Sequence, residues 1–188
     1  VALRSDLGFD GRPLIGYYGR LASHKDPVGL MKAYLASRER GIDAQFLIAG
    51  SGTLAGELRE VASESPYEDD IAVIAKVPQG KEGGYFLSMD VFLGGKNAGL
   101  SVLEAMAYGR AIVLYPERRP ETELIEHNVN GIIADDHTEG ALANAICEAV
   151  RNPQQIRKLG AEARNTVKSE ATIEKMANSF KEAIQYVI

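Results

Sequence analysis

A glycine and two basic residues follow the first short apolar segment of the chain. Gly19 permits a tight backbone turn, Arg20 carries a planar fork of donors, and Lys25 carries a flexible point charge. Two cations beside the start of a helix suit a diphosphate, because the helix N-terminus adds free N–H groups. Two ordinary solvated surface charges are the competing interpretation, since Arg and Lys side chains are mostly exposed.

A second candidate is the segment GLSVLEAMAYG at residues 99–109. It is apolar nearly all round, which predicts a largely buried helix with Glu104 in its middle. A buried carboxylate needs hydrogen-bond donors, and a ribose diol, a nearby cation or a solvent-facing helix edge would each satisfy it. The backbone N–H groups of Gly99, Leu100 and Ser101, at the helix start, favour an anion.

A weaker signal follows the second apolar segment, at Gly50-Ser51-Gly52. Two glycines around a serine can bring the backbone close to a ligand or form a plain tight turn. The dinucleotide fingerprint G-x-G-x-x-G is not completed, because Ala55 occupies the third glycine position. An NAD-dependent dehydrogenase is therefore disfavoured. Ser101 is not in a nucleophile elbow either, because Leu103 stands where that motif needs glycine.

Composition excludes several function classes. The 188 residues are 45% hydrophobic and 25% charged, with a net charge of −5, which argues against a nucleic-acid groove. One cysteine excludes an intrachain disulfide, and the three histidines lack metal-ligand spacing, so a structural zinc site is not expected. We find no apolar run long enough for a membrane span and no signal peptide, and we expect cytoplasmic residence.

The elements that must position these residues alternate between short apolar strands and helices. Strands are predicted at 13–18, 44–49, 71–75, 90–93, 110–114 and 131–134. Helices are predicted at about 26–40, 53–64, 80–88, 99–108 and 121–127. Strands that are apolar on both faces predict an α/β fold, a doubly wound Rossmann-like parallel sheet of about six strands with helices on both faces. Ligands bind such sheets at the carboxyl ends of the strands.

Three further helices are predicted at the C-terminal end. Asp136 and Glu139 have the spacing of a capping box at the start of the first, and Asn152-Pro153 separates it from the second. An apolar stripe from Ile173 to Val187 marks the last. With no linker or repeat visible, residues 1–188 are expected to form a single domain.

Several motifs occur together in a fixed order. They are Gly19-Arg20 with Lys25, Gly50-x-Gly52, Asp90-Val91-Phe92, the segment 99–109 around Glu104, and Glu123-Leu124-Ile125 followed by Asn130-Gly131. In this combination the chain resembles, from about residue 12 to its end, the C-terminal domain of retaining glycosyltransferases of the GT-B fold, the group 1 or family 4 kind.

The resemblance implies binding of a nucleotide-diphosphate sugar. The residues matching Arg20 and Lys25 would grip the diphosphate and are the catalytic candidates, and the one matching Glu104 would hold the ribose. The backbone at Gly99, Leu100 and Ser101 would approach the phosphates, with Gly50 and Gly52 also at the donor site and Val77 beside the base. No cofactor or metal is expected.

The resemblance also implies that half of an enzyme is missing. The first residue is Val1 rather than methionine, so we expect a longer protein whose N-terminal domain binds the acceptor, a glycan or a lipid-linked sugar. The isolated domain would then be inactive. The last helix would be partly exposed, because in this family it crosses back to that domain. The longer protein could attach peripherally to the inner membrane face.

Two positions depart from the family pattern. Lys96 stands eight residues before Glu104, where the family usually has a glutamate, and Arg119-Pro120 replaces a usual pair of glycines. Lys96 still counts as a donor-site candidate. Either the sugar or the acceptor is unusual, and an acidic sugar would suit Lys96, or catalysis is impaired. A non-catalytic assembly domain and a GT-B-like nucleotide-sugar epimerase therefore stay open as alternatives.

Overall fold

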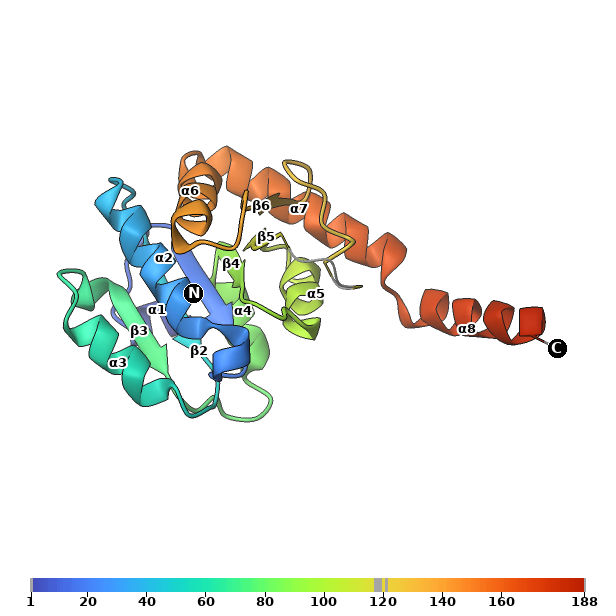
Figure 1. Ribbon diagram of the computed structural model, residues 1–188, viewed down its shortest axis with the longest axis horizontal. Coiled ribbons are helices and arrows are strands. Elements are labelled where there is room, and N and C mark those ends of the chain that lie inside the picture. The colour runs from blue at the N-terminus through green and yellow to red at the C-terminus, as the bar shows by residue number, and fades with distance from the viewer. Residues whose placement is uncertain (1, 117–119, 121, 188) are drawn as a thin grey trace.

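The computed structural model describes residues 2–116, 120 and 122–187. Its centre is a six-stranded sheet in which every pair of neighbours is parallel, in the order β3-β2-β1-β4-β5-β6 (Figure 1). The strands are β1 (Leu14–Tyr18), β2 (Gln45–Ala49), β3 (Ile71–Ile74), β4 (Val91–Gly94), β5 (Ala111–Leu114) and β6 (Gly131–Ile133). All six predicted strands and the predicted fold class are confirmed.

Helices cover both faces of this sheet. The covering helices are α1 (Ala2–Asp6), α2 (Pro27–Glu39), α3 (Ala55–Ser63), α4 (Glu82–Ser88), α5 (Leu100–Ala107), α6 (Glu139–Val150) and α7 (Pro153–Glu170), and α8 (Ile173–Val187) follows them outside these layers (Figure 1). Successive strand residues point to opposite faces, so Ile15 packs in one core with α2, α3 and α6, and Leu14 packs in another with α4 and α5. Burial on both faces is why the strands are apolar without alternation.

The helix ends follow local hydrogen-bonding rules. The Asp26 carboxylate accepts from the Gly29 N–H and caps α2, and the Asn152 side chain caps α7 just before Pro153, as its sequence predicts. The prediction for α6 was wrong in detail. The N-cap is Thr138 and not Asp136, because the Thr138 hydroxyl accepts from the Ala141 N–H. The Asp136 carboxylate instead accepts from the Thr138 N–H, in the turn before the helix.

The helix predicted at 121–127 was wrong. Within the described residues of that stretch the chain forms turns and a single bridge to the next strand. The buried Asn130 explains the difference. Its side chain accepts from the Glu126 N–H and donates to the Leu124 carbonyl oxygen, both at 2.8 Å, and thereby pairs backbone groups in a turn.

An ion-pair cluster joins the amino ends of the first three strands. Arg12 precedes β1, and its guanidinium hydrogen-bonds the Asp70 carboxylate just before β3. Arg38, at the end of α2, contacts the same carboxylate at 2.7 Å. This cluster lies at the edge of the sheet opposite the carboxyl ends, so it holds the fold and does not face the candidate site.

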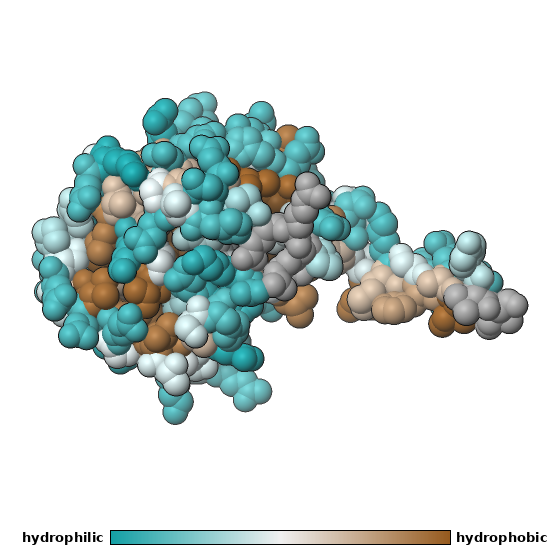
Figure 2. Space-filling model, viewed as in Figure 1, coloured by the Kyte–Doolittle hydropathy of each residue, from teal (hydrophilic) through white to brown (hydrophobic). Residues whose placement is uncertain are grey.

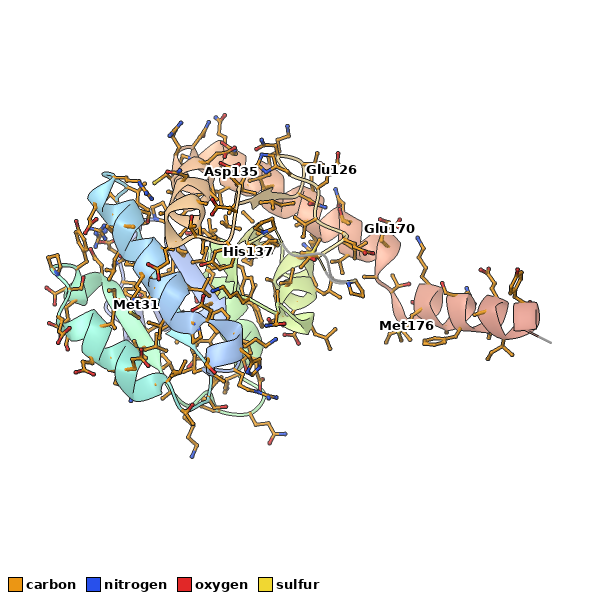
Figure 3. The ribbon with its side chains drawn as sticks, viewed as in Figure 1. Met31, Glu126, Asp135, His137, Glu170 and Met176 are labelled. Carbon is orange, nitrogen blue, oxygen red and sulfur yellow. The ribbon has the colours of Figure 1, made fainter. Side chains whose placement is uncertain are left out.

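The last helix stands apart from the sheet. α8 extends beyond Glu170 at the end of α7, and Met176 lies on this outlying helix (Figures 1 and 3). Apolar side chains gather along one side of it, and Ile173, Met176, Phe180 and Ile184 are all more than half exposed (Figure 2). The predicted exposure of this stripe is confirmed. No helix in the described part of the chain combines the length and apolarity needed to cross a membrane.

Candidate functional site

The strand order creates a crevice at one place on the carboxyl edge of the sheet. β1 pairs with β2 on one side and with β4 on the other, so the connections after β1 and after β4 lead away in opposite directions. The gap between such loops is the usual ligand position in a doubly wound sheet. A cleft of about 440 Å³ opens there, lined by Tyr17, Gly19, Arg20, His24 and Lys25 from the first side and by Gly94, Gly95, Ala98, Gly99, Leu100 and Ser101 from the second.

Both predicted cations reach this cleft. The Arg20 side chain is exposed and makes no ion pair with any residue that the structure describes. The Lys25 ammonium donates to the Asn97 carbonyl oxygen and lies 3.6 Å from where a Cβ of Gly99 would be, directly beside the start of α5. Two positive charges and a helix N-terminus therefore converge on one volume, which is the arrangement that attracts a polyanion.

The Tyr17 side chain contacts the backbone of the loop that follows β1. Its hydroxyl donates to the Arg20 carbonyl oxygen at 3.0 Å and packs closely against Gly19. Burial raises the pKa of Tyr17 to about 12, so the hydroxyl keeps its proton and remains a donor at neutral pH. This partly buried hydrogen bond holds the backbone of Arg20 in place.

The start of α5 is open to a ligand. Gly99 is its N-cap and provides no side-chain cap, so the N–H groups of Leu100 and Ser101 remain for water or an anion, while the Val102 N–H donates to the Gly99 carbonyl oxygen at 3.0 Å. The prediction of a largely buried helix was wrong, because Leu100 is 73% exposed and Tyr108 is 37% exposed. Only one face of α5, with Val102, Ala105 and Met106, packs into the core.

Glu104 lies on the exposed face of α5, which is the solvent-facing alternative that the sequence left open. It borders a second hollow of about 710 Å³, lined also by Tyr18, the segment 80–84, Leu87 and Tyr108. Its carboxylate makes no hydrogen bond or ion pair with the described part of the chain. Partial desolvation, and then the negative charge of Glu82, raise the pKa of Glu104. A ligand with hydroxyl donors would satisfy it.

The two glycines after β2 lie behind the cleft. The backbone of Gly50 has a φ of 150°, and a Cβ there would lie 1.7 Å from the Gly19 carbonyl oxygen. A Cβ at Gly52 would lie 2.1 Å from the Leu21 carbonyl oxygen. Gly50-Ser51-Gly52 thus lets the β2 loop pack directly against the β1 loop, and the Leu21 N–H donates to the Ser51 carbonyl oxygen at 2.9 Å.

Two other candidates also lie outside the lining of the cleft. Val77 is half-buried and packs on the core beneath α4 and α5. The Lys96 ammonium pairs with Asp26 at 2.6 Å and faces the Tyr115 ring, 5.8 Å from its centroid. Arg119 lies outside the described residues, and its neighbour Pro120 is exposed.

Some lining residues were not predicted. His24 and Gly95 border the cleft, and sequence spacing alone did not single them out. His24 shares the short loop of Arg20 and Lys25, which is the signal that could have drawn attention to it. Among the described residues, no group of three or more His, Cys, Asp or Glu side chains is arranged to hold a metal ion.

Comparison with known families decides the classification. The family described as glycosyl transferases group 1 matches residues 2–166. The chain belongs to this family. Among curated relatives of this group 1 chain, the alpha-D-kanosaminyltransferase of Streptomyces kanamyceticus is 26% identical over 160 residues, 81% of this chain and 40% of that protein. A GDP-mannose-dependent alpha-mannosyltransferase of Mycolicibacterium smegmatis is 30% identical over 169 residues, 88% of this chain and 41% of that protein. The group 1 chain thus spans about two fifths of the length of these relatives.

Solved structures of other proteins share the fold of this group 1 chain. The C-terminal domain of a group 1 protein from Francisella tularensis superposes with a TM-score of 0.78 at 19% identity, covering 90% of this chain and 91% of that one. Anabaena HepE, in complex with UDP-glucose, superposes with a TM-score of 0.81 at 19% identity, covering 98% of this chain and 52% of that one. The six-stranded parallel sheet therefore matches the domains of GT-B glycosyltransferases.

Proposed function

We propose that this group 1 chain is the C-terminal, donor-binding half of a retaining glycosyltransferase and that it binds a nucleotide-diphosphate sugar. The observation that carries the proposal is the convergence of Arg20, Lys25 and the N-terminus of α5 on one cleft. A neighbour of the same fold is a complex with UDP-glucose, which supports a ligand of this class.

The geometry of α5 orders the parts of such a ligand. Leu100 and Glu104 are four residues apart and lie on the same exposed face of the helix. Four residues advance a helix by roughly 6 Å, so a diphosphate at the helix start leaves the ribose near Glu104, one turn along. The ribose hydroxyls would donate to the Glu104 carboxylate, and the hollow beside it would take the nucleoside.

The same cations would assist the chemical step. As the bond between the anomeric carbon and the diphosphate oxygen breaks, negative charge develops on the leaving diphosphate. Arg20, Lys25 and the α5 N–H groups would stabilise that charge without a metal ion. An acceptor hydroxyl oxygen, from a glycan or a lipid-linked sugar, would bond to the anomeric carbon on the face that the diphosphate leaves, and the hydroxyl proton would pass to the departing diphosphate oxygen. We assign the acceptor site to an N-terminal domain of a longer protein.

Calorimetric titration with UDP, GDP and ADP tests the proposal. We expect saturable binding of at least one of them. Lys25→Ala should weaken it between roughly tenfold and hundredfold, because a hydrogen bond to a charged group contributes about 1.5–3 kcal/mol. Lys158→Ala is the matched control, since that exposed lysine lies on α7 outside the cleft. No heat with any of the three nucleotides up to about 1 mM would refute the proposal.

Lys96 favours one second candidate, a non-catalytic assembly domain. Its ammonium is engaged by Asp26 and does not line the cleft, so the position of the usual family glutamate supplies no free acidic group here. Such a domain would bind the donor without turnover. Assay of the longer protein for sugar transfer and donor hydrolysis separates the two candidates, because measurable transfer excludes the assembly domain.

A further inference from the structure

The two loops that form the cleft are tied to each other by three side-chain contacts. The Lys25 ammonium donates to the Asn97 carbonyl oxygen across the gap. In the opposite direction, the Asn97 side-chain amide donates to the His24 carbonyl oxygen at 2.8 Å. The Lys96 ammonium pairs with the Asp26 carboxylate at 2.6 Å. Consecutive residues of each loop therefore bind consecutive residues of the other.

The Asp26 end of this connection is held in place. Asp26 adopts a left-handed conformation with a φ of 54°, and its carboxylate also accepts from the Gly29 N–H at 3.2 Å as the cap of α2. Lys96 therefore joins its own loop to the first turn of a core helix. From the other side, the Tyr115 ring approaches the Lys96 ammonium and limits the directions it can take.

The backbones of the two loops are also in direct contact. A Cβ at Gly95 would lie 2.2 Å from the Lys25 carbonyl oxygen, so the loops touch next to the ion pair. A shift of one loop therefore displaces the other. The Lys25 side chain has four rotatable bonds, and its ammonium needs a fixed base to remain beside the start of α5.

We propose that the Asp26–Lys96 ion pair is a clasp that positions Lys25 for the diphosphate. The inference rests on the proposed function, because it assigns Lys25 the same role. It also gives position 96 a task other than holding an acidic sugar. The Lys96 charge is neutralised by Asp26 outside the cleft, so Lys96 acts through Lys25 and is a positioning residue.

Three substitutions isolate the clasp. Lys96→Met removes the charge and keeps the apolar stem. Lys96→Glu places a second carboxylate against Asp26. Asp26→Asn keeps an oxygen to cap α2 and adds an amide that can donate to the carboxylate introduced by Lys96→Glu. Both partners are partly exposed, 43% for Lys96 and 24% for Asp26, so a modest effect on binding is expected.

The assay is calorimetric titration with inorganic pyrophosphate and with the nucleotide diphosphates, together with the melting temperature of each variant. We expect Lys96→Met to weaken binding roughly two- to fivefold and Lys96→Glu by at least as much, with melting temperatures within about 2 °C of wild type. The double variant Asp26→Asn/Lys96→Glu should recover most of the affinity. A purely structural role would lower the melting temperature instead.

The Lys25→Ala background gives the decisive control. If the clasp acts through Lys25, then adding Lys96→Met to Lys25→Ala causes no further loss of affinity, because coupled residues are not additive. Additive losses would show that Lys96 contacts the ligand itself and would overturn the proposal, as would wild-type affinity in Lys96→Met. If the wild-type protein binds neither pyrophosphate nor any nucleotide, the proposed function is refuted, and with it the proposed role of the Asp26–Lys96 pair.

Discussion

Replacing Gly50 by alanine tests how the loop after β2 supports the candidate site. The Gly50 backbone has a φ of 150°, a conformation that alanine adopts only with strain of about 1–3 kcal/mol. Its Cβ would also lie 1.7 Å from the Gly19 carbonyl oxygen. One of the two loops must then move by more than about 1 Å, and overpacking of this kind costs a further 1–3 kcal/mol or so.

The costs of backbone strain and of overpacking together set a lower bound on the loss of folding stability in Gly50→Ala. A loss of at least about 2 kcal/mol should lower the melting temperature by at least roughly 4 °C in a chain of this size. Because the displaced carbonyl belongs to the residue before Arg20, nucleotide affinity should fall too, although Gly50 does not line the cleft. Thermal unfolding followed by circular dichroism, with calorimetric titration, measures both effects.

Gly56→Ala is the matched control. Gly56 lies in the first turn of α3, and a Cβ there would meet nothing within 4 Å. Alanine at such a helical position should stabilise the protein by about 0.4–1 kcal/mol. The two glycines are six positions apart in sequence, yet the same substitution should act with opposite sign. A melting temperature for Gly50→Ala equal to or above that of wild type would refute this reasoning.

Three further predictions concern single side chains. Desolvation is the larger cause of the raised pKa of Glu104, and the negative charge of Glu82 is the second. Glu82→Gln should therefore lower the pKa of Glu104, so that acidification weakens nucleotide binding only at a lower pH than in wild type. An unchanged dependence of affinity on pH would contradict this reasoning. Burial opposes the ionisation of Asp70, but its two arginine partners outweigh that effect and lower its pKa. The resulting stabilisation is present above the unfolded-state pKa and lost as pH falls, so Asp70→Asn should cost about 1–3 kcal/mol at pH 7. In denaturant titrations this difference should shrink below about pH 4, and a constant difference would argue against the ion pairs. The buried Tyr115 hydroxyl has no hydrogen-bond partner among the described residues. Tyr115→Phe should therefore leave the free energy of unfolding unchanged or raise it by up to about 1 kcal/mol, and a loss of more than about 1 kcal/mol would show that the hydroxyl is hydrogen-bonded.

Local sequence patterns predicted most of the fold. Short apolar segments such as 44–49 and 110–114 specify buried strands because both faces of a parallel sheet are covered. Asn152-Pro153 specifies the start of α7 because each residue acts on its own neighbours. The stretch 122–127 was misassigned because the buried Asn130 side chain, arriving from beyond the segment, pairs its backbone groups.

The candidate site was predictable as a set of positions but less so as an arrangement. Residues directly after β1 and at the start of α5 could be selected from sequence, because ligands bind at the carboxyl ends of parallel strands. The sequence left open whether Glu104 is buried or faces solvent, because the composition of a helix does not state which face meets the sheet. The close approach of Gly50 to Gly19 joins residues 31 positions apart, and the sequence pattern allowed either a ligand contact or a simple turn there.

The sequence alone determined which residues can carry charge, turn tightly or fill a core, because those properties belong to each side chain and its immediate neighbours. Which of these residues come into contact depends on the folded arrangement of the chain. The order of the strands places the loops after β1 and β4 against each other, and this brings Lys25 to the start of α5 and Lys96 to Asp26. In the sequence, Lys96 stands out as a reversal of charge near the donor. In the folded chain it forms an ion pair with Asp26. Its role follows from distance in space, which spacing along the chain does not encode.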